Sequence, residues 1–148
     1  MRHARAAALL GLLCGADAAT AQVMFEDRSD GVPAHVYSGG WSHFVGGGVA
    51  LFDCDADTLP DLFVAGGAAP AALLRNTGDF QFTPAELPAL TDITGVTGAY
   101  PLDIDNDGHM DLFVLRVGPN TVLRGEGGCR FSDATAVWGL PASDGGST

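Results

Sequence analysis

The chain has 148 residues, 47% of them hydrophobic, and carries 18 acidic against 7 basic residues, for a formal net charge of −11 at pH 7. Nucleic-acid binding needs a basic surface, so this charge argues against a nucleic-acid partner. The hydrophobic share is typical of a folded domain rather than of a disordered chain.

The first 21 residues resemble an export signal. Arg2 and Arg5 give a positive start, and the apolar run over residues 6–13 is too short to span a bilayer. Small residues at Ala19–Ala21 suit cleavage after Ala21. No other stretch is long and apolar enough to cross a membrane. We therefore expect a secreted, periplasmic or cell-surface protein without a transmembrane segment.

Residues 22–45 precede the main pattern. The stretch from Val23 to Asp27 alternates apolar and polar side chains, which predicts an outer strand. From Phe25 on, the sequence resembles the stretch that starts at Phe131. We therefore interpret it as the last part of a repeat unit whose beginning is absent. A Gly-rich connector follows, whose histidines and aromatic residues could form a ligand site. We favour the structural alternative, in which Trp41 and Phe44 cap the core and the histidines lie at its rim. These residues are His35, Tyr37, Trp41, His43 and Phe44.

Residues 46–95 form the first of two repeats. Aspartates stand at positions 1, 3, 5 and 9 of a loop between two apolar runs, Val49 to Phe52 and Leu62 to Ala65. Two more strands are expected at Ala72 to Arg75 and Phe80 to Thr83. The four aspartates of this first Asp loop are Asp53, Asp55, Asp57 and Asp61.

Residues 96–140 repeat the pattern, with the second Asp loop starting 50 residues after the first. Strands are expected at Leu112 to Leu115, Thr121 to Arg124 and Arg130 to Ala134. Evenly spaced strands with Gly- and Asp-rich turns predict an all-β repeat protein. A period near 50 with four antiparallel strands fits a β-propeller blade. The aspartates of the second Asp loop are Asp103, Asp105, Asp107 and Asp111.

The spacing of the aspartates predicts a cation site in each loop. Alternate side chains of an extended chain point the same way, so the carboxylates at positions 1, 3 and 5 converge when the chain curls. Clustered carboxylates repel one another unless a cation lies among them. Ca²⁺ accepts six to eight oxygens in irregular geometry, whereas Mg²⁺ needs near-octahedral ligands. A solvated acidic turn is the alternative, and two copies in register disfavour it.

The loops differ from an EF-hand and from each other. An EF-hand has an acid at position 12 and flanking helices, whereas these loops have Val64 and Val114 there. Position 6 is Gly108 in the second loop but Thr58 in the first. A β-branched residue with positive φ costs about 1–2 kcal/mol. We therefore predict that the first loop binds calcium more weakly or avoids that conformation.

At these aspartates and at the Asn-x-Gly turn that starts at Asn76, the chain resembles the FG-GAP/VCBS repeat family. More narrowly, it resembles secreted proteins that combine these repeats with an ASPIC/UnbV domain, related to cartilage acidic protein. The resemblance implies a β-propeller, usually seven-bladed, with Ca²⁺ in hairpin loops as in integrin α-subunit heads. It implies two sites, with backbone oxygens from position 7. The implied ligands are Asp53, Asp55, Asp57, Leu59 and Asp61, then Asp103, Asp105, Asp107, His109 and Asp111.

The resemblance implies more blades than this chain holds. We expect an N-terminal fragment of a larger propeller, with residues 141–148 starting a truncated continuation and the remaining blades beyond Thr148. The expected function is a non-catalytic adhesion or recognition module for a protein or glycan ligand. An extracellular carbohydrate-active hydrolase, with its active site largely outside this chain, is the alternative. Cys54 and Cys129 are either bridged or separate buried thiols, and the sequence leaves both open.

Overall fold

The computed structural model of the protein describes residues 23–85 and 93–140. The export signal predicted for residues 1–21 and the continuation predicted for residues 141–148 lie outside the described residues. Within the described residues, no helix has the length and apolar character needed to cross a bilayer.

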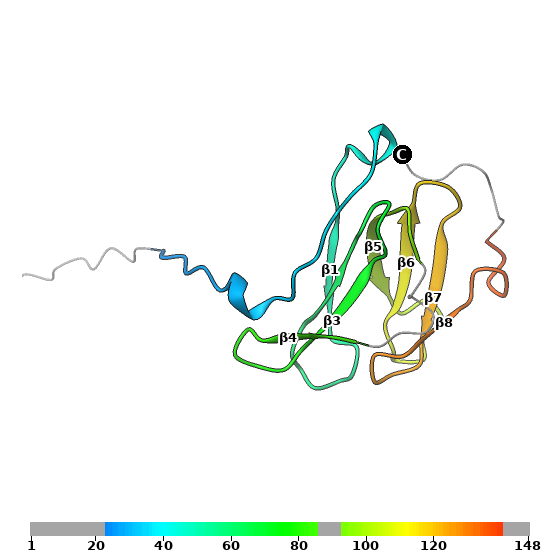
Figure 1. The fold of residues 1–148 in the computed structure, drawn as a ribbon. Coiled ribbons are helices and arrows are strands. Elements are labelled where there is room, and N and C mark those ends of the chain that lie inside the picture. The colour runs from blue at the N-terminus through cyan, green and yellow to red at the C-terminus, as the bar shows by residue number, and fades with distance from the viewer. Residues whose placement is uncertain (1–22, 86–92, 141–148) are drawn as a thin grey trace, which may run out of the picture.

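The fold is all-β and consists of two four-stranded antiparallel sheets, as predicted (Figure 1). In each sheet the strands lie in chain order, which is the arrangement of a propeller blade. The first sheet contains β1 (Val49–Phe52), β2 (Asp61–Val64), β3 (Ala72–Asn76) and β4 (Phe82–Pro84). The second sheet contains β5 (Val96–Leu102), β6 (Asp111–Arg116), β7 (Thr121–Gly125) and β8 (Phe131–Asp133). Two short 3-10 turns, η1 (Ser29–Gly31) and η2 (Trp41–His43), precede the sheets.

Strand register places both Asp loops at the same point of their hairpins. Phe52, the last residue of β1, pairs with Asp61, the first residue of β2. Leu102 pairs with Asp111 in the same way at the end of β5. Position 9 of each loop is therefore the first residue of the second strand, and the loop is closed by the sheet itself.

The core lies between the two sheets, which use opposite faces to form it. The first sheet contributes Phe63 and Leu73, and the second contributes Leu112 and Leu123, all of them buried. In the repeat, Leu112 corresponds to Leu62 and not to Phe63. The sheets therefore pack head to tail, as successive blades do, rather than through equivalent faces.

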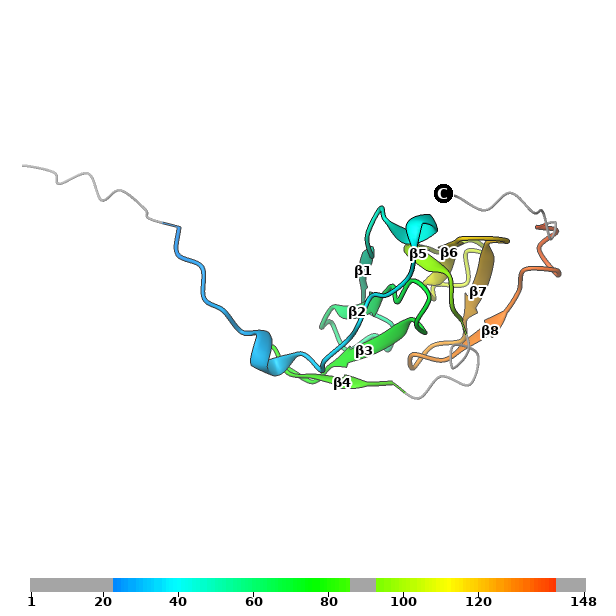
Figure 2. The same ribbon diagram turned by 45° about the horizontal axis from the view of Figure 1, so that its top comes forward.

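The first strands of the two sheets, β1 and β5, lie side by side (Figure 2). The N–H of Gly48 donates to the carbonyl of Thr97 at 2.9 Å. A Cβ on Gly48 would lie 2.9 Å from the Cα of Gly98, so this close approach of the two backbones requires glycine. The two sheets are thus joined by main-chain contact as well as by the core.

Two predictions for the N-terminal region fail in the structure. Residues 23–27 form no strand, and Phe25 is 95% exposed, because neither of the two described sheets has an edge beside this segment to pair with its backbone (Figure 1). Trp41 and Phe44 do not cap the core; they stack on each other, with ring centroids 4.8 Å apart, and are exposed. Tyr37 takes the place beside the core instead.

The two histidines of the connector are partly buried beside this region and make local contacts. His35 Nε2 lies 2.9 Å from the carbonyl oxygen of Ala65. The Tyr37 hydroxyl donates to the carbonyl of His43 at 3.0 Å. The His35 contact ties the connector to the residue that follows β2, whereas the Tyr37 contact lies within the connector. The placement of the histidines at the rim of the core stays a prediction.

Candidate metal centre

The carboxylate at position 1 curls each Asp loop around itself. In the first loop, Asp53 accepts N–H hydrogen bonds from Asp57 at 3.2 Å and from Thr58 at 2.8 Å. Burial raises the pKa of Asp53, but N–H groups of the loop outweigh it and hold this pKa below its usual value. The second loop makes the same two bonds, both at 3.1 Å, with Asp103 as acceptor and Asp107 and Gly108 as donors.

The carboxylate at position 9 ties the loop to the third strand of its sheet. Asp61 is fully buried and accepts the N–H of Cys54 at 2.9 Å and the N–H of Asn76 at 2.8 Å. Burial raises the pKa of Asp61; its two N–H bonds oppose the rise, and neighbouring loop carboxylates add to it. The second loop repeats the arrangement with Asp111, which accepts from Ile104 at 2.7 Å and from Gly125 at 2.8 Å.

Position 3 of the first loop holds a buried carboxylate with one oxygen that has no partner. The side chain of Asp55 is only 8% exposed. Its Oδ2 faces Arg75 in an ion pair, while Oδ1 has no partner among the described residues. A buried carboxylate oxygen without a donor is costly unless a cation faces it. This oxygen therefore fits a metal site.

The structure brings most of the predicted side-chain ligands together. Carboxylate oxygens of Asp53, Asp55 and Asp57 lie within 4.8 Å of one another. In the second loop the corresponding group is Asp103, Asp105 and Asp111. The two groups differ in whether position 5 or position 9 takes part. Both consist of oxygen donors alone, which suits a hard cation such as Ca²⁺.

Position 7 was predicted to offer a carbonyl oxygen. The structure places its N–H group against position 5: Leu59 donates to Asp57 at 2.8 Å, and His109 donates to Asp107 at 2.9 Å. These bonds hold the backbone of position 7 close to the carboxylate of position 5. Ligation of a metal by the carbonyl oxygens of position 7 stays a prediction.

Position 6 has a left-handed backbone in both loops. Gly108 has a φ of 87°, and Thr58 has a φ of 71°. The alternative that the first loop avoids this conformation is therefore wrong: the bond from the Thr58 N–H to Asp53 holds the residue there despite its β-branch. Weaker calcium binding by the first loop stays a prediction.

Two arginines contact the loops, and the spacing of the aspartates does not predict this contact. The guanidinium of Arg124 binds position 3, with Nε 2.6 Å from Asp105, and position 5, with Nη2 2.8 Å from Asp107. Arg75 pairs with positions 3 and 5 of the first loop in the same way, its Nη2 lying 3.8 Å from Asp57. The signal that could have found them is their matching place before the last residue of β3 and β7.

A disulfide joins Cys54 to Cys129, so the pairing that the sequence left open is settled in favour of a bridge. Cys54 stands at position 2 of the first loop, and Cys129 lies in the turn before β8. The Cys129 N–H also donates to the Cys54 carbonyl at 2.9 Å. Both sulfurs lie close to Asp61, but as disulfide sulfurs they offer no thiolate to a metal.

The two Asp loops are neighbours at one end of the sheets. A cavity of about 220 Å³ lies between them, with Asp53 and Asp55 on one side and His109 on the other. The wall is completed by the turn at Gly127 and Gly128. The disulfide lies at the same place, so the first loop is held against the second repeat.

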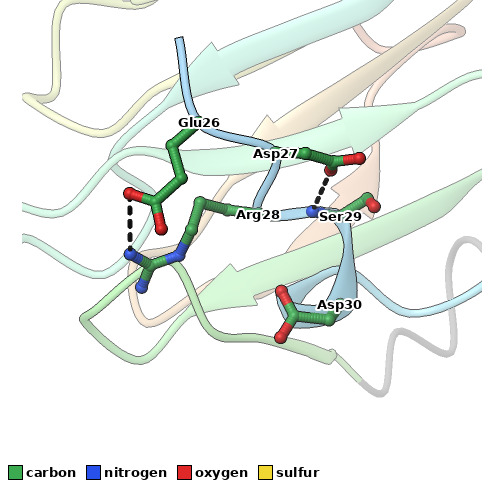
Figure 3. A pocket seen from close by; sticks show the side chains of 5 residues that line it. All are labelled: Glu26, Asp27, Arg28, Ser29 and Asp30. Carbon is green, nitrogen blue, oxygen red and sulfur yellow. Dashed lines mark hydrogen bonds and ion pairs between the residues drawn. The ribbon is translucent and has the colours of Figure 1, made fainter. Parts of the chain in front are cut away.

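A hollow near η1 is a separate, local feature. Figure 3 shows that it is lined by consecutive residues from Glu26 to Asp30, all of them exposed. Asp27 accepts the Ser29 N–H at 2.9 Å, which lowers the pKa of Asp27, and Arg28 lies 3.7 Å from Glu26. Both contacts join residues two positions apart in the sequence, so the hollow is a local feature of this segment.

The sheets and their paired loops define a β-sheet repeat protein with blade-like units. Residues 53–114 match the model of the FG-GAP-like repeat family. The match runs from position 1 of the first Asp loop into β6, and it confirms the resemblance on which the loops were interpreted. A narrower relationship to ASPIC/UnbV proteins stays a prediction. Searches of the curated proteins and of the solved structures found no match.

Proposed function

We propose that this chain is a calcium-binding segment of a β-propeller, in which the metal is structural. The observation that carries the proposal is the carboxylate of Asp55, which is nine-tenths buried beside two further carboxylates and has an oxygen without a donor. A divalent cation satisfies that oxygen and offsets the repulsion among the loop aspartates. The repetition of the arrangement in the second loop supports the same role there.

In this proposal each residue of the loop has a defined task. Position 1 holds the curl through backbone N–H groups, and position 9 fixes the loop to the third strand. Positions 3 and 5 supply negative charge that calcium neutralises. Position 7 adds a carbonyl oxygen. The ligands are Asp53, Asp55, Asp57, Leu59 and Asp61 in the first loop, and Asp103, Asp105, Asp107, His109 and Asp111 in the second.

The outer faces of the two sheets support the larger propeller. Phe113 corresponds to the buried Phe63 but lies on the free face of the second sheet, opposite Tyr100, which is 58% exposed. Leu62 corresponds to the buried Leu112 but lies on the free face of the first sheet, opposite Leu51, which is 59% exposed. Each free face therefore has the apolar character of a blade interface, and we propose that further blades cover both.

The proposed role of the whole is recognition without catalysis, in an exported protein. Export rests on the pattern of residues 1–21, and a structural calcium suits an extracellular setting, where modules bind it at about 10⁻⁴–10⁻³ M. The exposed stacked pair of Trp41 and Phe44 supports a recognition role, because aromatic residues are enriched at interfaces. The partner would be a protein or a glycan.

Calorimetric titration of the chelator-treated chain with CaCl₂, together with thermal unfolding in EGTA and in 10 mM CaCl₂, tests the proposal. Two sites are expected, with a rise in melting temperature of about 5 °C or more. Asp55→Asn should remove the first site, and Asp105→Asn the second. Asp30→Asn, an exposed carboxylate outside the loops, is the control. No binding and no shift by the wild-type chain would refute the metal site.

A further inference from the structure

Each Asp loop has a second cationic partner built into the chain. Arg75 projects from β3 onto positions 3 and 5 of the first loop, and Arg124 projects from β7 onto the same positions of the second. In both cases the guanidinium contacts the Oδ2 oxygens of the two carboxylates. Two independent copies of one geometry, 49 residues apart in the sequence, show that the contact belongs to the repeat and not to a chance surface pair.

The position-9 aspartate aims the arginine. Asp61 accepts the N–H of Asn76, the residue directly after Arg75, and Asp111 accepts the N–H of Gly125, directly after Arg124. Position 9 therefore fixes the end of the third strand against the loop. With the backbone fixed there, the arginine side chain reaches positions 3 and 5. The buried aspartate thus helps to position the arginine.

We infer that Arg75 and Arg124 are counter-ions that hold the Asp loops in their folded shape without calcium and lower their calcium affinity. The inference rests on the proposed calcium site. Four carboxylates in one short loop repel one another, and a guanidinium on two of them relieves part of that repulsion. The same positive charge repels Ca²⁺ and leaves less negative charge for the metal to neutralise.

The geometry lets each arginine remain while calcium binds. In the first loop the guanidinium contacts the Oδ2 oxygens, and Asp55 Oδ1 has no partner. The arginine side chains are about half exposed, at 50% for Arg75 and 43% for Arg124, so water screens their charge in part. We therefore expect the arginines to tune affinity rather than to block the site.

Arg75→Gln and Arg124→Gln test the inference, each measured by thermal unfolding in EGTA and by calorimetric titration with CaCl₂. Without calcium, each variant should melt about 2–5 °C below the wild type. The calcium affinity of the altered loop should tighten about three- to tenfold. The rise in melting temperature on adding calcium should therefore be larger in the variants than in the wild type.

Two further variants separate charge from other effects. Arg124→Lys keeps the charge and loses the two-pronged geometry, so its calcium affinity should stay close to that of the wild type. Arg130→Gln removes an exposed arginine whose side chain, among the described residues, hydrogen-bonds to the carbonyl of Glu126 and to no carboxylate of an Asp loop, and it should change neither measurement. Equal effects of Arg130→Gln and Arg124→Gln would show that only the net charge of the protein matters, and they would overturn the inference.

The failures of the two proposals can be told apart. Absence of calcium binding by the wild-type chain refutes the calcium site, and the claimed effect on affinity with it. Wild-type binding that weakens in Arg75→Gln and Arg124→Gln leaves the calcium site intact and overturns the counter-ion inference, because the arginines would then support the metal. Unchanged melting in EGTA overturns the counter-ion inference as well.

Discussion

Cys54 and Cys129 are joined twice, by a disulfide and by a hydrogen bond from the Cys129 N–H to the Cys54 carbonyl at 2.9 Å. The two residues are 75 positions apart and belong to different repeats. The link therefore fastens the first Asp loop to the last turn of the second sheet. The position that corresponds to Cys54 in the second loop is Ile104, and the position that corresponds to Cys129 in the turn before β4 is Phe80. The repeat therefore does not provide a second bridge of this kind among the described residues.

The double variant Cys54→Ser/Cys129→Ser is expected to be less stable than the wild type. Closure of a loop of this length by a disulfide stabilises the fold by about 4 kcal/mol in the chain-entropy model. Denaturant unfolding monitored by circular dichroism measures the loss. The same variant should weaken calcium binding at the first loop more than at the second, since only the first loop holds Cys54. Equal weakening at both loops would contradict the local role of the bridge.

Exchanging the residues at position 6 should change the calcium affinities of the two loops in opposite directions. Thr58 adopts a φ of 71°, which costs about 1 kcal/mol for a side chain with a Cβ. Thr58→Gly should therefore stabilise the first loop and tighten its calcium binding several-fold. Gly108→Thr should do the reverse in the second loop, where a Cβ meets open space and only the backbone is strained. Calorimetric titration of both variants measures these affinities. A change in the same direction in both variants would contradict the prediction.

Position 9 should matter for folding even without calcium. Asp111 is fully buried and accepts two backbone N–H groups, so Asp111→Asn turns one acceptor into a donor that faces a donor. The expected loss is about 2–3 kcal/mol in EGTA, measured by urea unfolding. Asp105→Asn is the matched comparison, because Asp105 is partly exposed and should affect calcium affinity more than calcium-free stability. Equal losses of stability in EGTA from Asp111→Asn and Asp105→Asn would contradict a separate role of position 9 in folding.

The parts of this fold that could be predicted from the sequence are those set by local spacing. The aspartates and the strands beside them follow from residues within a few positions of one another. The contact of Arg124 with Asp105 depends on the register of β6 and β7, which local patterns do not give. Phe25 had an alternating pattern around it but no sheet edge to join. Trp41 is large and apolar, but Tyr37 already fills the place beside the core.

The free faces of the sheets should make the isolated chain associate head to tail. The internal interface joins the Phe63 face of one sheet to the Leu112 face of the next, and the free faces carry their equivalents, Phe113 and Leu62. Such a contact is heterologous, so it can continue from chain to chain. Sedimentation velocity at increasing concentration should therefore show species larger than a monomer.

Charged substitutions test that arrangement one face at a time. Tyr100→Lys blocks the free face of the second sheet, and Leu51→Lys blocks the free face of the first, so each variant alone should remain a monomer. A mixture of the two still contains one intact face of each kind, and it should form dimers and nothing larger. Val23→Lys, in the exposed N-terminal segment, is the control and should associate as the wild type does. Dimers formed by either face variant alone would show that equivalent faces meet, because a head-to-tail contact cannot form when one of its two faces carries the lysine.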